Sequence, residues 1–82
     1  MKNEINNSKM TRQIYDIPDD VVEILHQQGL WEKYRERPPY QQNDYIGWIT
    51  RAKRPGTRQK RLNQMLRELS GGVEYMGVRW KK

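Results

Sequence analysis

The stretch WITRAKRPGTRQKRLNQML, residues 48–66, decides the fold of this 82-residue chain. Apolar residues recur at i, i+3, i+4 and i+7 on both sides of its centre, which is the spacing of a stripe along one helix face. We therefore expect one helix over about 40–53 and another from about 57 to 69, joined by a corner at Arg54-Pro55-Gly56. The two stripes consist of Tyr45, Trp48, Ile49 and Ala52, and then of Leu62, Met65, Leu66 and Leu69.

The ends and the interior of these two helices carry further signals. The later helix has two candidate starts, because the Thr57 hydroxyl can cap free N–H groups and Pro55 suits a first helical turn. Ser70-Gly71-Gly72 ends it. Gly47 lies inside the earlier helix at a cost of about 1 kcal/mol relative to Ala. A close approach of two helices at Gly47 would explain that cost.

Two shorter helices are expected upstream. Pro18 suits the first position of a helix over about 18–28, whose acidic first turn complements the helix dipole and which Gly29 ends. A short helix within 30–37 follows, and the two prolines after it end it. The apolar residues expected to face the core are Val21, Val22, Ile24, Leu25, Trp31 and Tyr34.

The whole pattern predicts an all-α fold, a small single-domain bundle of three to four helices over residues 14–72. At 82 residues the chain has room for one modest core, and we expect a monomer. Residues 1–13 are polar and lack periodicity, so we expect a disordered tail. Residues 73–82 alternate only weakly and show no evident partner strand. We expect them to form an extended basic tail laid on the core.

Charge divides the chain into two unequal parts. Residues 1–50 carry six Lys/Arg and eight Asp/Glu, a net of −2, and residues 51–82 carry ten and two, a net of +8, which together give +6. Such asymmetry permits binding to a polyanion, although a solvated face looks the same. The candidate contacts for a polyanion or an acidic partner are Lys53, Arg54, Lys60 and Arg61.

Arg58 carries a different expectation. It lies four residues before Leu62, at the edge of the buried stripe, so its stem can cover apolar surface. Its guanidinium can also bond the last carbonyls of the preceding helix, which that helix's dipole favours. We therefore predict a structural role for Arg58.

The segment YIGWITRAKRPGTRQKRLNQMLRELSGG, residues 45–72, resembles the YdeI or OmpD-associated proteins, also called bacteriocin-protection proteins. The resemblance extends over about 14–72 and departs from the family at Gly56, where a glutamate is common. It implies a compact helical fold, a loose link to envelope stress or antimicrobial-peptide tolerance, and no known catalytic residues. The residues that carry it are Tyr45, Trp48, Ile49, Ala52, Lys53, Thr57, Arg58, Arg61 and the apolar run from Leu62 through Leu66 to Leu69.

Candidate catalytic residues do not converge in the sequence. Ser8 lies in the expected tail, Ser70 at a helix end and His26 in a short amphipathic helix, so we expect no nucleophilic triad. The chain has no cysteine and one histidine, which argues against a zinc site. The acidic cluster of Asp19, Asp20 and Glu23 is explained by the helix dipole. We expect neither an enzyme nor a bound cofactor.

Two functions stay open at this stage. The first is a small non-enzymatic interaction module whose partner is an acidic protein or an anionic surface. The second is a nucleic-acid-binding protein that uses the basic corner 51–61, beside which Gln59, Asn63 and Gln64 could meet base edges. We expect only weak, non-specific nucleic-acid binding and favour the first function.

The expected cellular location is inferred from two features that the sequence lacks. No run of apolar residues approaches the roughly 20 that span a bilayer. The opening residues MKNEINNSKM lack the apolar segment of a secretory signal peptide. We therefore expect a cytoplasmic protein without a transmembrane segment.

Overall fold

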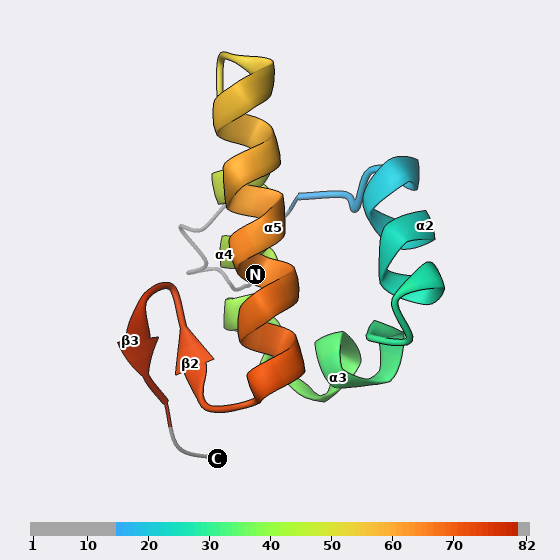
Figure 1. Ribbon diagram of the computed structural model, residues 1–82, viewed down its shortest axis with the longest axis vertical. Coiled ribbons are helices and arrows are strands. Elements are labelled where there is room, and N and C mark those ends of the chain that lie inside the picture. Colours follow the sequence, from blue (N-terminus) through green and yellow to red (C-terminus); the bar gives the residue numbers. More distant parts are fainter. Residues whose placement is uncertain (1–14, 81–82) are drawn as a thin grey trace, which may run out of the picture.

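The computed structural model describes residues 15–80, and within them it is a mostly helical bundle, as predicted (Figure 1). The expected tail 1–13 and the last two residues lie outside the described residues. The elements, in chain order, are α2 (Asp19–Gln27), α3 (Trp31–Glu36), α4 (Pro39–Thr50), α5 (Pro55–Gly71), β2 (Glu74–Tyr75) and β3 (Val78–Arg79).

Prolines and glycines place the helix ends close to the predicted positions. Pro18 precedes α2 in an extended conformation, and Pro38 does the same for α4. Pro55, not Thr57, begins α5, and no side-chain cap is present there. Gly72 ends α5 with φ +80°, and its N–H donates to the Glu68 carbonyl at 2.9 Å. A residue with a Cβ would be strained in that left-handed conformation.

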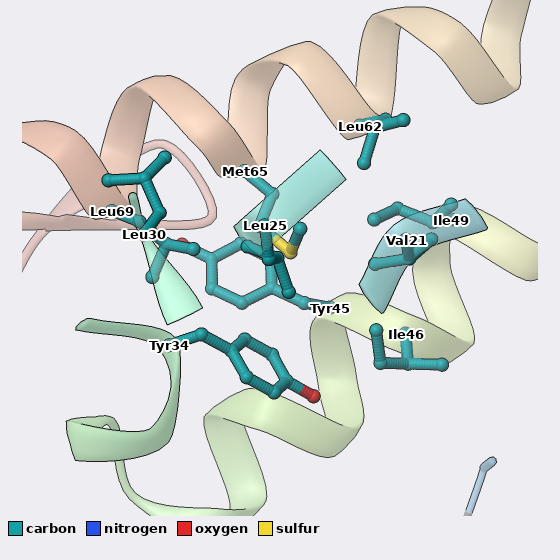
Figure 2. Packing of buried hydrophobic residues seen from close by; sticks show 10 residues of the cluster. All are labelled: Val21, Leu25, Leu30, Tyr34, Tyr45, Ile46, Ile49, Leu62, Met65 and Leu69. Atoms are coloured by element: carbon teal, nitrogen blue, oxygen red, sulfur yellow. The ribbon is translucent and has the colours of Figure 1, made fainter. Parts of the chain in front are cut away.

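The longest described helix, α5, lies at the centre, and the other described elements are arranged around it (Figure 1). α4 packs against α5, α3 contacts it as well, and α2 packs on α3. All four helices contribute to one core, which Figure 2 shows from close by. Its buried apolar side chains are Val21, Leu25, Leu30, Tyr34, Tyr45, Ile46, Ile49, Leu62, Met65 and Leu69.

The predicted apolar stripes agree with the observed burial at some positions and differ from it at others. Tyr45, Ile49 and Leu62 are buried, whereas Trp48 and Leu66 are half-buried and pack against the edge of the core. Ile46 is fully buried although it lies beside the stripe. Since α4 faces the rest of the bundle as well as α5, it needs a wider apolar face than a single stripe.

Gly47 has a different neighbour from the one predicted. A Cβ built on it would lie 2.5 Å from the Cε2 atom of the Tyr15 ring, so the glycine admits an aromatic side chain and not a second helix. The Tyr15 hydroxyl accepts a hydrogen bond from Arg51 Nη1 at 3.0 Å, and its backbone N–H donates to Asn43 Oδ1 at 2.8 Å. Gly47 thus leaves room for the Tyr15 ring, and the two hydrogen bonds hold the segment that precedes α2 in place.

The prediction of one extended tail after α5 is wrong for residues 74–79, which form an antiparallel hairpin. Glu74 pairs with Arg79 and Tyr75 with Val78, so the partner strand comes from the same short segment. Met76 and Gly77 form the turn with φ of +53° and +86°. Two positive φ values define a tight hairpin turn, whose usual sequence signal is Asn-Gly or Asp-Gly. Met-Gly lacks that signal.

Candidate functional site

A groove of about 480 Å³ runs along one face of α5 and the neighbouring end of α4. Among residues 15–80, three of those that line it are cations, Lys60, Arg61 and Arg67, and none is acidic. Lys60 and Arg67 are seven residues apart on α5, which places them on one helix face two turns from each other. We call this site the basic groove; its lining residues are Trp48, Thr57, Lys60, Arg61, Asn63, Gln64 and Arg67.

None of the three cations in the groove forms an ion pair with a residue from 15 to 80. Lys60 and Arg67 are exposed, and within residues 15–80 the only ion pair is the one that joins Arg58 to Asp20. Arg61 is held in place: its Nη1 donates to the Trp48 carbonyl at 2.7 Å, and its guanidinium carbon lies 5.4 Å from the Trp48 ring centroid. The groove therefore has one fixed cation on an aromatic face and two cations free to meet an anion.

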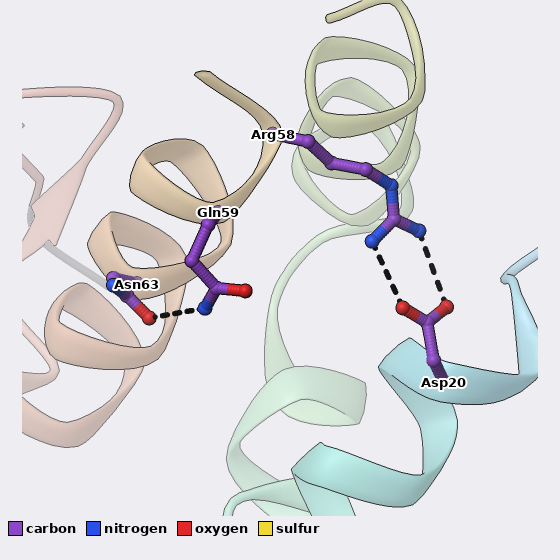
Figure 3. Close-up of polar contacts among 4 residues, drawn as sticks. All are labelled: Asp20, Arg58, Gln59 and Asn63. Atoms are coloured by element: carbon purple, nitrogen blue, oxygen red, sulfur yellow. Dashed lines mark hydrogen bonds and ion pairs between the residues drawn. The ribbon is translucent and has the colours of Figure 1, made fainter. Parts of the chain in front are cut away.

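Two amide side chains of the groove are oriented by their own helix. Gln59 Nε2 donates to Asn63 Oδ1 at 2.9 Å (Figure 3), and Gln64 Nε2 donates to Glu68 Oε2 at 2.9 Å. Each amide has further hydrogen-bonding capacity beyond the bond described, because an amide carries two donors and an acceptor. Asn63 and Gln64 can thus supply directed polar contacts between the cations.

The structure separates the four basic residues that the sequence selected. Lys60 and Arg61 line the groove, whereas Lys53 and Arg54 are exposed in the turn before α5 and do not line it. Arg67 belongs to the groove and was missed. Its signal was present in the sequence, since residues 60, 64 and 67 repeat at i, i+4 and i+7 on the polar face of the helix.

Arg58 has a partner other than the predicted carbonyls. Its two terminal nitrogens donate to Asp20 Oδ2 at 2.8 Å and to Oδ1 at 3.1 Å, which links the start of α5 to α2 (Figure 3). The hydrogen bond from Arg58 lowers the pKa of Asp20 from its ordinary value. The Trp48 carbonyl, in the last turn of α4, is instead bonded by Arg61, one turn further along α5, so the bond suggested for Arg58 is not observed.

A buried polar cluster lies behind the groove and was not anticipated from the sequence. It consists of Arg37, Gln41 and Glu68, all buried. Arg37 donates to Gln41 Oε1 and to the Glu68 carbonyl, both at 3.1 Å, and its guanidinium carbon lies 4.6 Å from the Trp80 ring centroid. These contacts join α4, α5 and the end of the hairpin.

The Glu68 carboxylate is the acceptor at the centre of that cluster. It is 1% exposed and accepts hydrogen bonds from the Tyr45 hydroxyl and Gln64 Nε2, and from the Met76 and Gly77 backbone N–H groups at 2.8 Å each. Burial raises the pKa of Glu68, but these hydrogen bonds outweigh burial and leave it below its ordinary value. Burial, followed by the bond to Glu68, raises the pKa of Tyr45.

Of the catalytic candidates, His26 and Ser70 lie on different helices, α2 and α5, and Ser8 lies outside the described residues. His26 stacks on Trp31 with ring centroids 4.7 Å apart, and Ser70 is exposed near the end of α5. In the described part of the chain, no three His, Cys, Asp or Glu side chains are grouped so that they could hold a metal ion. None of the helices found between residues 15 and 80 has both the length and the apolar character needed to cross a membrane.

Comparison with known proteins gives one match. A family model described as bacteriocin-protection, YdeI or OmpD-associated matches residues 15–72, which contain all four helices of the described region and the whole basic groove. No curated protein and no solved structure matches the chain. The chain belongs to the bacteriocin-protection, YdeI or OmpD-associated family.

Proposed function

We propose that this chain is a non-catalytic binding module whose basic groove receives an acidic segment of a protein partner. The observation that carries the proposal is the unpaired charge of Lys60 and Arg67, on one helix face of a hollowed site. Carboxylates of a partner would complete ion pairs that residues 15–80 leave open. No reaction is assigned to the groove, because its side chains are cations, amides, a hydroxyl and an indole ring.

The shape of the groove favours a peptide segment over a flat anionic surface. Its volume of about 480 Å³ lies within the range of pockets that enclose part of a ligand. Asn63 and Gln64 can bond a peptide backbone, which presents both donors and acceptors. The Trp48 ring, covered in part by Arg61, adds an apolar wall with a fixed charge beside it.

The family description suggests a protective role, and the charge of the chain indicates how such protection would operate. Many antimicrobial peptides are cationic, and this chain carries +6. Direct capture would bring like charges together, which costs energy and slows encounter. We therefore propose indirect protection through an acidic partner inside the cell.

The test compares two double variants that each remove two charges. Lys60→Gln/Arg67→Gln neutralises the free cations of the groove, and Lys53→Gln/Arg54→Gln neutralises the turn outside it. Isothermal titration with an aspartate- and glutamate-rich peptide should show binding that salt weakens and that the groove variant loses by about tenfold or more. The turn variant should bind nearly as the wild type does, and a cationic peptide should not bind.

Three results would contradict the proposal. Equal losses in the two double variants would mean that only net charge matters. Tighter binding to anionic lipid vesicles than to the acidic peptide would make a membrane surface the partner. Sequence-specific duplex binding below about 1 μM at near-physiological salt would make nucleic-acid binding the function instead.

A further inference from the structure

A separate pocket of about 280 Å³ lies between α3, the first half of α4 and the segment before α2. Tyr15, Ile17 and Pro39 form its apolar walls, and Tyr34 and Arg35 of α3 bring polar groups to it. None of these residues lines the basic groove. The volume is near the lower end of the range for small-molecule pockets, so it suits a compact ligand.

Tyr34 lines this pocket, and its hydroxyl is an unpaired polar group among residues 15–80. Tyr34 is only 1% exposed, and its hydroxyl has no hydrogen-bond partner among residues 15–80. Figure 2 shows it pointing away from the Tyr45 ring. Burial raises the pKa of Tyr34 to about 12, so the hydroxyl keeps its proton at neutral pH and can donate. A buried donor without an acceptor destabilises the protein until something accepts its hydrogen bond.

Arg35 contributes a positive charge that no carboxylate of residues 15–80 balances. It forms no ion pair with any residue from 15 to 80. Its Nη1 donates to Gln42 Oε1 at 3.1 Å and its guanidinium carbon lies 5.8 Å from the Trp31 ring centroid, so the side chain is positioned in advance. A guanidinium has five N–H donors, and most of those on Arg35 remain available.

The two amides that also line the pocket are already engaged. Gln42 Nε2 donates to the Arg35 and Arg37 carbonyls at 3.2 and 2.7 Å. Asn43 Oδ1 accepts the Tyr15 N–H at 2.8 Å. The Tyr34 hydroxyl and the Arg35 guanidinium therefore remain available for recognition, next to apolar walls.

We propose that this pocket binds a small organic monocarboxylate with an apolar body. The carboxylate would accept the Tyr34 hydroxyl proton in a hydrogen bond and pair with the Arg35 guanidinium, and the apolar body would lie against Tyr15, Ile17 and Pro39. One cation matches a single negative charge. The site is distinct from the basic groove, so this inference does not depend on the function proposed for the groove.

Phenylacetate is a suitable probe because it joins one ring to one carboxylate. Amide NMR spectra of the isotope-labelled full chain should shift saturably around residues 34–43, with a dissociation constant of about 1 mM or lower. Phenylacetamide keeps the shape and loses the charge, so it should bind about tenfold more weakly or not at all. Shifts around residues 60–67 should stay small.

Two variants and two controls localise the binding. Tyr34→Phe removes only the unpaired hydroxyl, so it should melt at or above the wild-type temperature and bind phenylacetate about tenfold more weakly. Arg35→Gln should weaken binding at least as much. Tyr40→Phe and Arg79→Gln remove a hydroxyl and a cation outside the pocket and should leave affinity unchanged.

The proposal is overturned if phenylacetate gives no saturable shift, or if Tyr34→Phe and Arg35→Gln bind it like the wild type. A Tyr34→Phe variant that melts well below the wild type would also overturn it, because the hydroxyl would then have a fixed partner within the protein or its bound water.

Discussion

Gly47 allows the segment before α2 to pack against α4 through the ring of Tyr15. The Tyr15 ring occupies the place that a Cβ would take, and Arg51 and Asn43 bond its hydroxyl and its backbone. Tyr15 is also a wall of the carboxylate pocket proposed above. Because Gly47 has no side chain, the Tyr15 ring can pack on α4, and in that position it also lines the proposed carboxylate pocket.

Gly47→Ala should destabilise the protein, although Ala is normally the better helix former. The new Cβ would lie 2.5 Å from the ring of Tyr15, and we expect a loss of about 1–3 kcal/mol in the free energy of unfolding. Gly56→Ala is the control, because a Cβ there would have no atom within 4 Å, and it should be neutral or stabilising. Urea denaturation measures both, and equal effects would show that the Tyr15 contact is unimportant.

At the scale of elements, the joint between α4 and α5 depends on one arginine more than on its neighbours. Arg61 bonds the Trp48 carbonyl near the end of α4 and lies over the Trp48 ring. Arg58 makes a bidentate ion pair with Asp20, but the two side chains are 32% and 60% exposed, so water and salt screen the pair. Lys60 makes no ion pair with any residue of the described region.

Alanine substitutions should therefore rank in a definite order. Arg61→Ala should lower the free energy of unfolding by about 1–2 kcal/mol, because it removes a charged hydrogen bond and a cation–π contact. Arg58→Ala should cost less than about 1 kcal/mol and Lys60→Ala no more than about 0.5 kcal/mol. Thermal and urea unfolding check the order, and a larger loss for Arg58→Ala than for Arg61→Ala would contradict it.

At the scale of the whole molecule, Glu68 connects the helices to the hairpin. Its carboxylate bonds Tyr45 of α4, Gln64 of α5 and two N–H groups of the hairpin turn. The turn includes Met76, whose positive φ is a backbone conformation that residues other than Gly, Asn and Asp rarely adopt. The ionised form of Glu68 thus stabilises a conformation that the local sequence disfavours.

Stability should fall in acid because of this carboxylate. The pKa of Glu68 is lowered in the folded protein, so its contribution is fully present above the ordinary value of 4.5 and is lost as pH falls through the folded value. Glu68→Gln should cost about 2–4 kcal/mol near neutral pH, because only one of its two terminal atoms can accept a hydrogen bond. Below the ordinary pKa of a glutamate, the stability of the Glu68→Gln variant should vary less with pH than the stability of the wild type.

Glu74→Gln is the matched control, because it removes an exposed carboxylate from β2. Its urea-unfolding profile against pH should follow the wild type. A Glu68→Gln variant that keeps the full acid dependence of the wild type would contradict the role assigned to Glu68. Loss of the hairpin's NMR cross-strand contacts in the same variant would support that role directly.

The sequence by itself determined where the helices begin and end, and much of what they bury. Prolines and glycines act through their own backbone geometry, so Pro18, Pro38, Gly29 and Gly72 mark helix ends whatever else the chain does. The apolar period of the two long helices likewise follows from local geometry, which is why Tyr45, Ile49 and Leu62 were placed in the core.

Only the tertiary structure decided which polar residues meet. Arg58 reaches Asp20 across 38 residues, Glu68 reaches the hairpin turn, and Tyr15 lies on Gly47, and none of these pairs shares a helical spacing. The Glu68 carboxylate bonds both residues of the hairpin turn, whose Met-Gly sequence carries no usual turn signal. Such contacts depend on how elements pack, and packing brings together residues whose positions in the chain carry no common pattern.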